Sequence, residues 1–93
     1  MERERFVEEM TVIKEGLIEL LAAGDEEQQE KINILFEDLI KQADEIKESD
    51  EERLPDAFVA MGHWLGPNYH YHSTLSSTRN LFIDYIELDL TKT

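Results

Sequence analysis

Apolar residues recur at helical spacing near the start of the chain, separated by steps of four, three, four and three residues. These residues are Phe6, Met10, Ile13, Leu17 and Leu20. Such steps place side chains on one side of an α-helix, with charged residues on the other sides. The pattern predicts an amphipathic helix from about Glu2 to Ala23.

A second apolar stripe follows a break at Gly24 and Asp25. Its members are Ile32, Leu35, Phe36, Leu39, Ala43 and Ile46. Gly24 suits the left-handed position that follows a helix end, and Asp25 is a good N-cap, so a second helix is predicted from about Glu26 to Glu48. Because a tight link joins two long amphipathic helices, we expect an antiparallel hairpin whose apolar stripes face each other.

The pattern breaks between Ser49 and Pro55, where acids cluster and a proline would interrupt a helix. A short third helix is predicted from about Asp56 to Leu65. Its sequence is apolar almost all the way round, which is typical of a buried helix. Gly66 and Pro67 are stop signals, and a loop is expected at 68–73.

A fourth helix is predicted from a cap at Ser73 or Ser76 to about Leu90. Because apolar and acidic residues also alternate at 86–90, a C-terminal strand is the alternative there. The sequence therefore predicts one all-α domain, a small antiparallel helical bundle. Its core is expected to contain Phe6, Met10, Ile13, Leu17, Leu35, Leu39, Phe58, Met61, Leu65, Phe82 and Ile86.

Charge divides the chain of 93 residues into an acidic half and an almost uncharged half. Residues 1–56 carry 19 Asp or Glu against 7 Lys or Arg, whereas Arg79 is the only charged residue in 57–83. The total of −13 repels nucleic acids and anionic lipid and attracts basic proteins. With no Cys and no long uninterrupted apolar run, the sequence predicts no disulfide, signal peptide or membrane span, and a cytoplasmic location is expected.

Carboxylates form a narrow strip on the second predicted helix, at steps of four, seven, seven and four residues. They are Glu26, Glu30, Glu37, Asp44 and Glu48. The first helix has a similar strip, formed by Glu4, Glu8, Glu15 and Glu19. Either strip is a solvated face that keeps the protein soluble or a surface for a basic partner. The longer one extends over roughly 33 Å with carboxylates about 6 to 10 Å apart, a spacing that also allows mimicry of nucleic-acid phosphates.

Aromatic residues gather in the loop before the fourth helix. Tyr69 and Tyr71 are candidates for partner contacts, since tyrosine buries a large area and keeps one polar atom. The alternative is that both rings pack over the open end of the bundle.

Histidines in the same region are weak candidates for metal ligands. His70 and His72, with His63 or a carboxylate, would supply three ligands for zinc or iron, but no known metal-binding spacing is matched. We therefore expect no metal and no cofactor. Phosphate-binding loops and nucleophile motifs are also missing, so the protein is not expected to be an enzyme.

In length, acidity, helical layout and the tyrosines before the last helix, the chain resembles small bacterial nuclease-immunity proteins and phage-encoded inhibitors. The likeness is architectural, and no functional residue is transferred from it. The acidic charge and the two tyrosines favour a module that covers a basic surface of a nuclease or nucleic-acid-binding effector without contacting nucleic acid or membrane itself. The alternative is a homo-oligomeric structural or regulatory protein, so a monomer and a homodimer are both compatible with the sequence.

Overall fold

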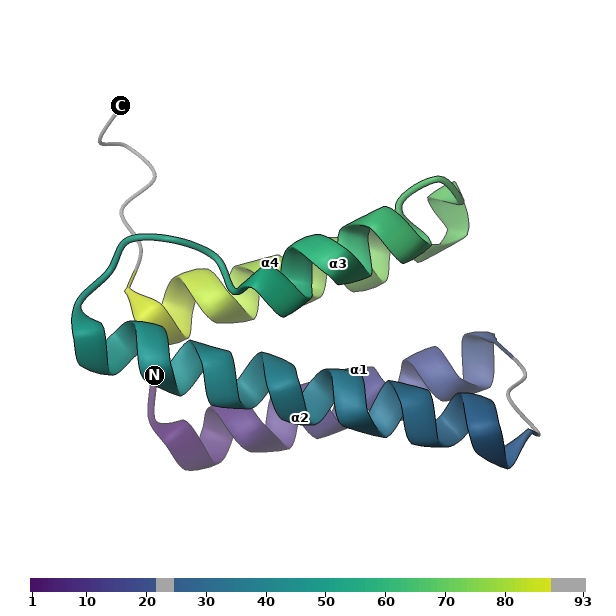
Figure 1. Ribbon diagram of the computed structural model, residues 1–93, viewed down its shortest axis with the longest axis horizontal. Helices are drawn as coiled ribbons and strands as arrows, with labels where there is room; N and C mark the ends of the chain where they lie inside the picture. The colour runs from purple at the N-terminus through teal and green to yellow at the C-terminus, as the bar shows by residue number, and fades with distance from the viewer. Residues whose placement is uncertain (22–24, 88–93) are drawn as a thin grey trace.

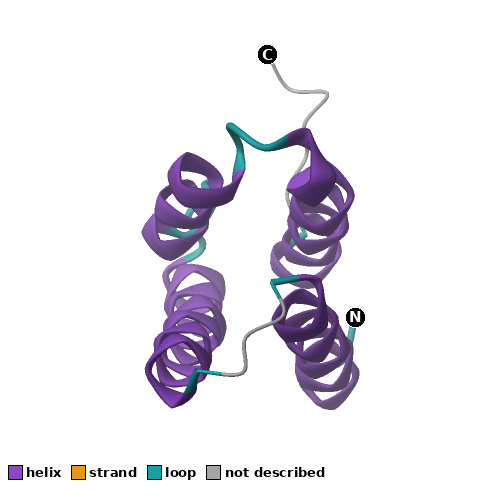
Figure 2. Cartoon of the chain, turned by 90° about the vertical axis from the view of Figure 1, so that its right-hand side faces the viewer, coloured by secondary structure: helices purple, strands orange, loops and turns teal. Residues whose placement is uncertain are grey.

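The computed structural model describes residues 1–21 and 25–87, which form four α-helices and one 3-10 turn without a strand. The elements are α1 (Arg3–Leu20), α2 (Glu26–Ser49), α3 (Asp56–Leu65), η1 (Tyr69–Tyr71) and α4 (His72–Ile86). Each helix runs antiparallel to the one before it (Figure 1). Seen end-on, α2 and α3 form one layer and α1 and α4 the other (Figure 2). The all-α bundle predicted from the sequence is confirmed.

Local capping explains where α2 begins and ends. Asp25 is the N-cap of α2, and its side chain accepts a hydrogen bond from the backbone N–H of Glu27 at 3.0 Å. At the other end of α2, Asp50 takes a left-handed conformation with φ of 57°, and its N–H bonds to the carbonyl of Ile46. Asp tolerates this conformation better than most residues. The predicted role of Gly24 and the predicted helical end at Ala23 lie outside the described residues, and α1 ends at Leu20.

The two apolar stripes of the hairpin meet in a single core that α3 and α4 complete. Eight of the eleven predicted core residues are buried: Phe6, Met10, Leu17, Leu39, Met61, Leu65, Phe82 and Ile86. The other three, Ile13, Leu35 and Phe58, are half-buried and pack against it. Leu20 departs from its predicted stripe, with 57% of its surface exposed at the end of α1.

Aromatic rings join three helices at one end of this core. The ring of Phe6 on α1 stacks on Tyr85 of α4, with centroids 4.1 Å apart and planes 4° apart. Phe82 on α4 lies 5.8 Å from Phe6 and 5.6 Å from Phe58 on α3. Such rings bury large areas and prefer offset or tilted contacts. They fix the N-terminal half of α1 against α4.

The link between α3 and α4 differs from the predicted loop. Its residues 69–71 form a 3-10 turn that leads directly into α4 at His72, so neither Ser73 nor Ser76 caps the helix. The reason is local: the side chain of Asn68 accepts a hydrogen bond from the N–H of His70 at 3.1 Å and starts the turn. At its other end α4 stops at Ile86, which is helical. Glu87 follows in a left-handed conformation with φ of 61°, and its N–H bonds to the carbonyl of Ile83, so α4 ends before the predicted Leu90. The remaining predicted positions, 88–90, lie outside the described residues.

The helix α3 matches its predicted bounds, but it is not buried on all sides. Met61 and Leu65 face the core, whereas Val59, Ala60 and Trp64 are exposed. A two-layer arrangement covers only one side of a short helix, so an apolar helix placed here presents apolar side chains to solvent. The prediction of a fully buried helix is therefore wrong.

Candidate functional site

Both predicted carboxylate strips lie on the outer side of the α1–α2 hairpin. The exposed members are Glu4, Glu8, Glu15 and Glu19 on α1 and Glu26, Glu30, Glu37 and Glu48 on α2. None of these eight forms an ion pair within the described residues. The two strips together present solvated negative charge to any approaching molecule.

Asp44 does not belong to this free surface, although the helical spacing placed it in the strip. Its side chain is only 28% exposed. One carboxylate oxygen accepts a hydrogen bond from the Tyr85 hydroxyl at 2.5 Å, and the other accepts from Nε of Arg3 at 3.0 Å. Asp44 thus links α2 to α4 and α1, and its carboxylate has a structural function.

The environment of Tyr85 stabilises its neutral form. Burial, followed by the hydrogen bond to Asp44 and the charge of that carboxylate, raises the pKa of the Tyr85 hydroxyl from 10 to about 12. The ammonium group of Lys47 lies 4.2 Å from the centroid of the Tyr85 ring and covers its outer side. The hydroxyl therefore acts as a hydrogen-bond donor and not as an anion.

Stability should fall at high pH because of Tyr85. Since the unfolded chain loses this proton near pH 10 and the folded protein near pH 12, stability is unaffected below pH 10 and decreases between these values. The loss is at most about 3 kcal/mol, and less where water screens the hydroxyl. Urea unfolding at several pH values should show it. Tyr85→Phe should remove this part of the pH dependence, and an unchanged profile would contradict the assignment.

The two candidate tyrosines of η1 have different surroundings. Tyr69 is 72% exposed, and its ring stacks on that of His70 with centroids 4.6 Å apart. Tyr71 is half-buried and packs against the core, as the alternative interpretation expected. Tyr69 is therefore the more accessible of the two. Figure 1 shows η1 where α3 joins α4. The carboxylates of the two strips are on α1 and α2 instead.

The histidines are not arranged as a metal centre. Nε2 of His72 donates a hydrogen bond to the carbonyl oxygen of Gly66 at 2.7 Å, and His70 stacks on Tyr69. His63 is exposed on α3. Within residues 1–21 and 25–87, no group of three His, Cys, Asp or Glu side chains is placed to hold a metal ion.

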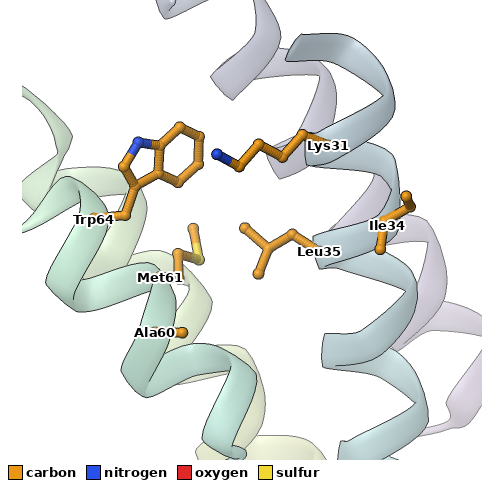
Figure 3. A pocket seen from close by; sticks show the side chains of 6 residues that line it. All are labelled: Lys31, Ile34, Leu35, Ala60, Met61 and Trp64. Atoms are coloured by element: carbon orange, nitrogen blue, oxygen red, sulfur yellow. The ribbon is translucent and has the colours of Figure 1, made fainter. Parts of the chain in front are cut away.

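An apolar groove of about 370 Å³ lies between α2 and α3, and the sequence analysis did not identify it. It is lined by Lys31, Ile34, Leu35, Ala60, Met61 and Trp64. Leu35 and Met61 point toward each other at its floor, while Lys31 reaches from α2 toward the ring of Trp64 (Figure 3). The ammonium group lies 5.9 Å from the centroid of that ring, close enough for a weak cation–π contact.

A hydrogen bond anchors the two walls of the groove to each other. The side-chain oxygen of Gln42 on α2 accepts from the backbone N–H of Ala57, in the first turn of α3, at 2.8 Å. Gln42 follows Leu35 by seven residues, so it lies two turns further along the same side of α2. It satisfies an N–H that has no partner within the helix and holds α3 against α2 at this point.

A sequence signal for the groove was present in the almost entirely apolar third helix. Trp64 is 41% exposed and Ile34 51%, and both line the groove. Apolar side chains gathered in this way on a surface mark interaction sites. The sequence alone does not show which sides of α3 the other helices leave uncovered, so it does not locate the groove.

Comparison of the chain with protein-family models, curated proteins and solved structures gives no match. Across the described ranges, no helix is both long and apolar enough to cross a membrane.

Proposed function

We propose that the protein is a small acidic protein-binding module, of the inhibitor or immunity type, that covers a basic surface of a partner protein. The observation that carries the proposal is the pair of exposed carboxylate strips on α1 and α2, whose eight members have no ion-pair partner in the described part of the chain. A partner that binds nucleic acid, such as a nuclease, has a surface of the opposite sign.

Electrostatics favours a basic protein as the partner. With a net charge of −13, the chain repels nucleic acids and attracts basic surfaces over about a Debye length. Like-charged side chains one turn apart destabilise a helix by a few tenths of a kcal/mol per pair, so the strips have a small cost in the isolated protein. A basic partner would remove this repulsion. Tyr69, exposed on η1, offers an additional contact of the kind found at interface hot spots.

Reversing charges in the strip should weaken binding mainly through the association rate. We expect Glu26→Lys, Glu37→Lys and Glu48→Lys together to lower that rate constant at low salt by about tenfold or more and to flatten its salt dependence. The partner is first captured from a lysate of the source organism at low and high salt and identified by mass spectrometry. Surface-binding kinetics with the purified partner then measure both rate constants.

The matched control carries the same change in net charge at other exposed positions. Glu45→Lys, Glu52→Lys and Asp84→Lys lie outside both strips. If the two triple variants slow association equally, net charge alone acts and the strip has no specific function. If neither variant changes association, the proposal is wrong.

A further inference from the structure

The groove between α2 and α3 has the composition of a docking site for a helix. Its floor is formed by Leu35 and Met61, and its sides by exposed apolar residues. Grooves of this kind accept the apolar face of an amphipathic helix, whose anchoring side chains recur at three and four residues. The volume of about 370 Å³ falls in the range of known ligand pockets.

Carboxylates border this groove along α2. Ile34, its outer wall, has Glu30 one turn before it and Asp38 one turn after it, and Glu27 lies one turn before Lys31. Glu27, Glu30 and Asp38 are all exposed and form no ion pair in the part of the chain that the structure describes. An occupant with basic residues beside its apolar face would match both the floor and this border.

A second copy of the chain fits the groove less well. It would bring the same three border acids and a further charge of −13 against the first copy, and like charges facing each other across an interface are costly. The apolar floor would suit either occupant. The acidic border selects the basic one.

We propose that the groove between α2 and α3 binds an amphipathic, basic helix of the partner protein. Apolar side chains of that helix rest on Leu35 and Met61, and its Lys and Arg residues meet Glu27, Glu30 and Asp38. Docking moves the ammonium group of Lys31 away from Trp64 and covers the indole ring. This inference rests on the proposed function. The exposed charges speed the association with a basic partner, and the groove supplies the apolar contact that slows its dissociation.

The only tryptophan of the chain, Trp64, reports on the groove directly. The probe is a synthetic peptide of about 18 residues with leucine at helical spacing and lysine elsewhere. Titration into the full chain should move the Trp64 emission to shorter wavelength, because the peptide removes the ring from water. Two control peptides have the same leucine face with glutamate in place of lysine, or the same composition with scattered leucines. Neither should produce the shift at the same concentrations.

Variants of the walls separate apolar docking from charge attraction. Ile34→Gln with Ala60→Gln makes both outer walls polar at exposed positions and should weaken peptide binding by about tenfold or more. Val12→Gln removes an exposed apolar side chain from α1 and should leave binding unchanged. Circular dichroism and urea unfolding verify that each variant keeps its fold.

Neutralising carboxylates at the border of the groove should weaken peptide binding more than neutralising carboxylates of the strip. Glu27→Gln with Asp38→Asn and Glu37→Gln with Glu48→Gln each remove two charges. We expect the first pair to weaken peptide binding by about fivefold, and the second pair to have a smaller effect. Binding of the partner through the strips is measured separately with the charge-reversal variants described above.

The possible results distinguish this inference from the proposed function. Suppose that the strip variants abolish binding of the partner, while the groove variants change neither the affinity for the peptide nor the shift of the Trp64 emission. The groove inference is then wrong, and the proposed function stands. If no basic peptide or protein binds, both are wrong. A blue-shifted emission that depends on protein concentration alone, with a dimer in sedimentation, would show that a second copy covers the groove and would overturn the inference.

Discussion

Replacing Phe6 with alanine should lower the free energy of unfolding by about 3 to 5 kcal/mol, the largest effect expected for a single substitution in this chain. Phe6 is fully buried, stacks on Tyr85 and contacts Phe82, so truncation removes apolar burial and leaves a cavity where α1 meets α4. Domains of this size have about 5 to 15 kcal/mol of total stability. Urea unfolding followed by circular dichroism measures the change, and the melting temperature should fall by about 15 °C or more.

Two further substitutions test the reason for this loss. Phe6→Leu keeps most of the buried area but loses the ring contacts, so it should cost about 1.5 kcal/mol or less. Leu20→Ala changes a leucine of the same helix whose surface is 57% exposed, and should cost less than about 1 kcal/mol. If Leu20→Ala destabilised the protein as much as Phe6→Ala, the packing of α1 described above would be wrong.

Helical periodicity predicted most of the fold because both long helices bury a single, regular stripe. The bounds of α3 follow directly from Pro55 and Gly66, which interrupt the apolar pattern on either side. The start of α4 was missed because the Asn68 side chain begins a 3-10 turn that continues into the helix. A cap provided by a turn three residues upstream has no simple sequence pattern.

The surface was harder to predict than the core. Helical spacing places Asp44 in line with four exposed glutamates, but spacing alone does not reveal that Arg3 and Tyr85, both 41 residues away in sequence, approach its carboxylate. The groove likewise requires knowing which side of α3 lies against α2. Both features depend on the relative position of helices that are distant in sequence, and periodicity within one helix does not contain that information.

The acidic half and the apolar half therefore have separate parts in the proposed mechanism. The strips on α1 and α2 act on the encounter, because exposed charges change association rates more than dissociation rates. The groove acts on the lifetime of the complex, because buried apolar anchors dominate dissociation. A variant that changes both rates together is expected at Glu30, which belongs both to the strip and to the border of the groove. Asp44 differs from both groups, because its carboxylate supports the fold.

Asp44→Ala should destabilise the fold by about 1.5 to 3 kcal/mol, mainly because the hydroxyl of the buried Tyr85 would lose its charged acceptor. The exposed Arg3 contributes little, since ion pairs in water are weak. Asp44→Asn keeps an acceptor oxygen and should cost less, while Glu37→Ala on the same strip should change stability by no more than about 0.5 kcal/mol.

In urea unfolding, Asp44→Ala combined with Tyr85→Phe should cost less than the sum of the two single changes, because both remove the same hydrogen bond. If Asp44→Ala and Glu37→Ala lowered the free energy of unfolding equally, Asp44 would have no structural function and would belong to the free acidic surface. The expected difference is the reason that Asp44 is left unchanged in the charge-reversal variants, where a loss of binding must not arise from a loss of folding.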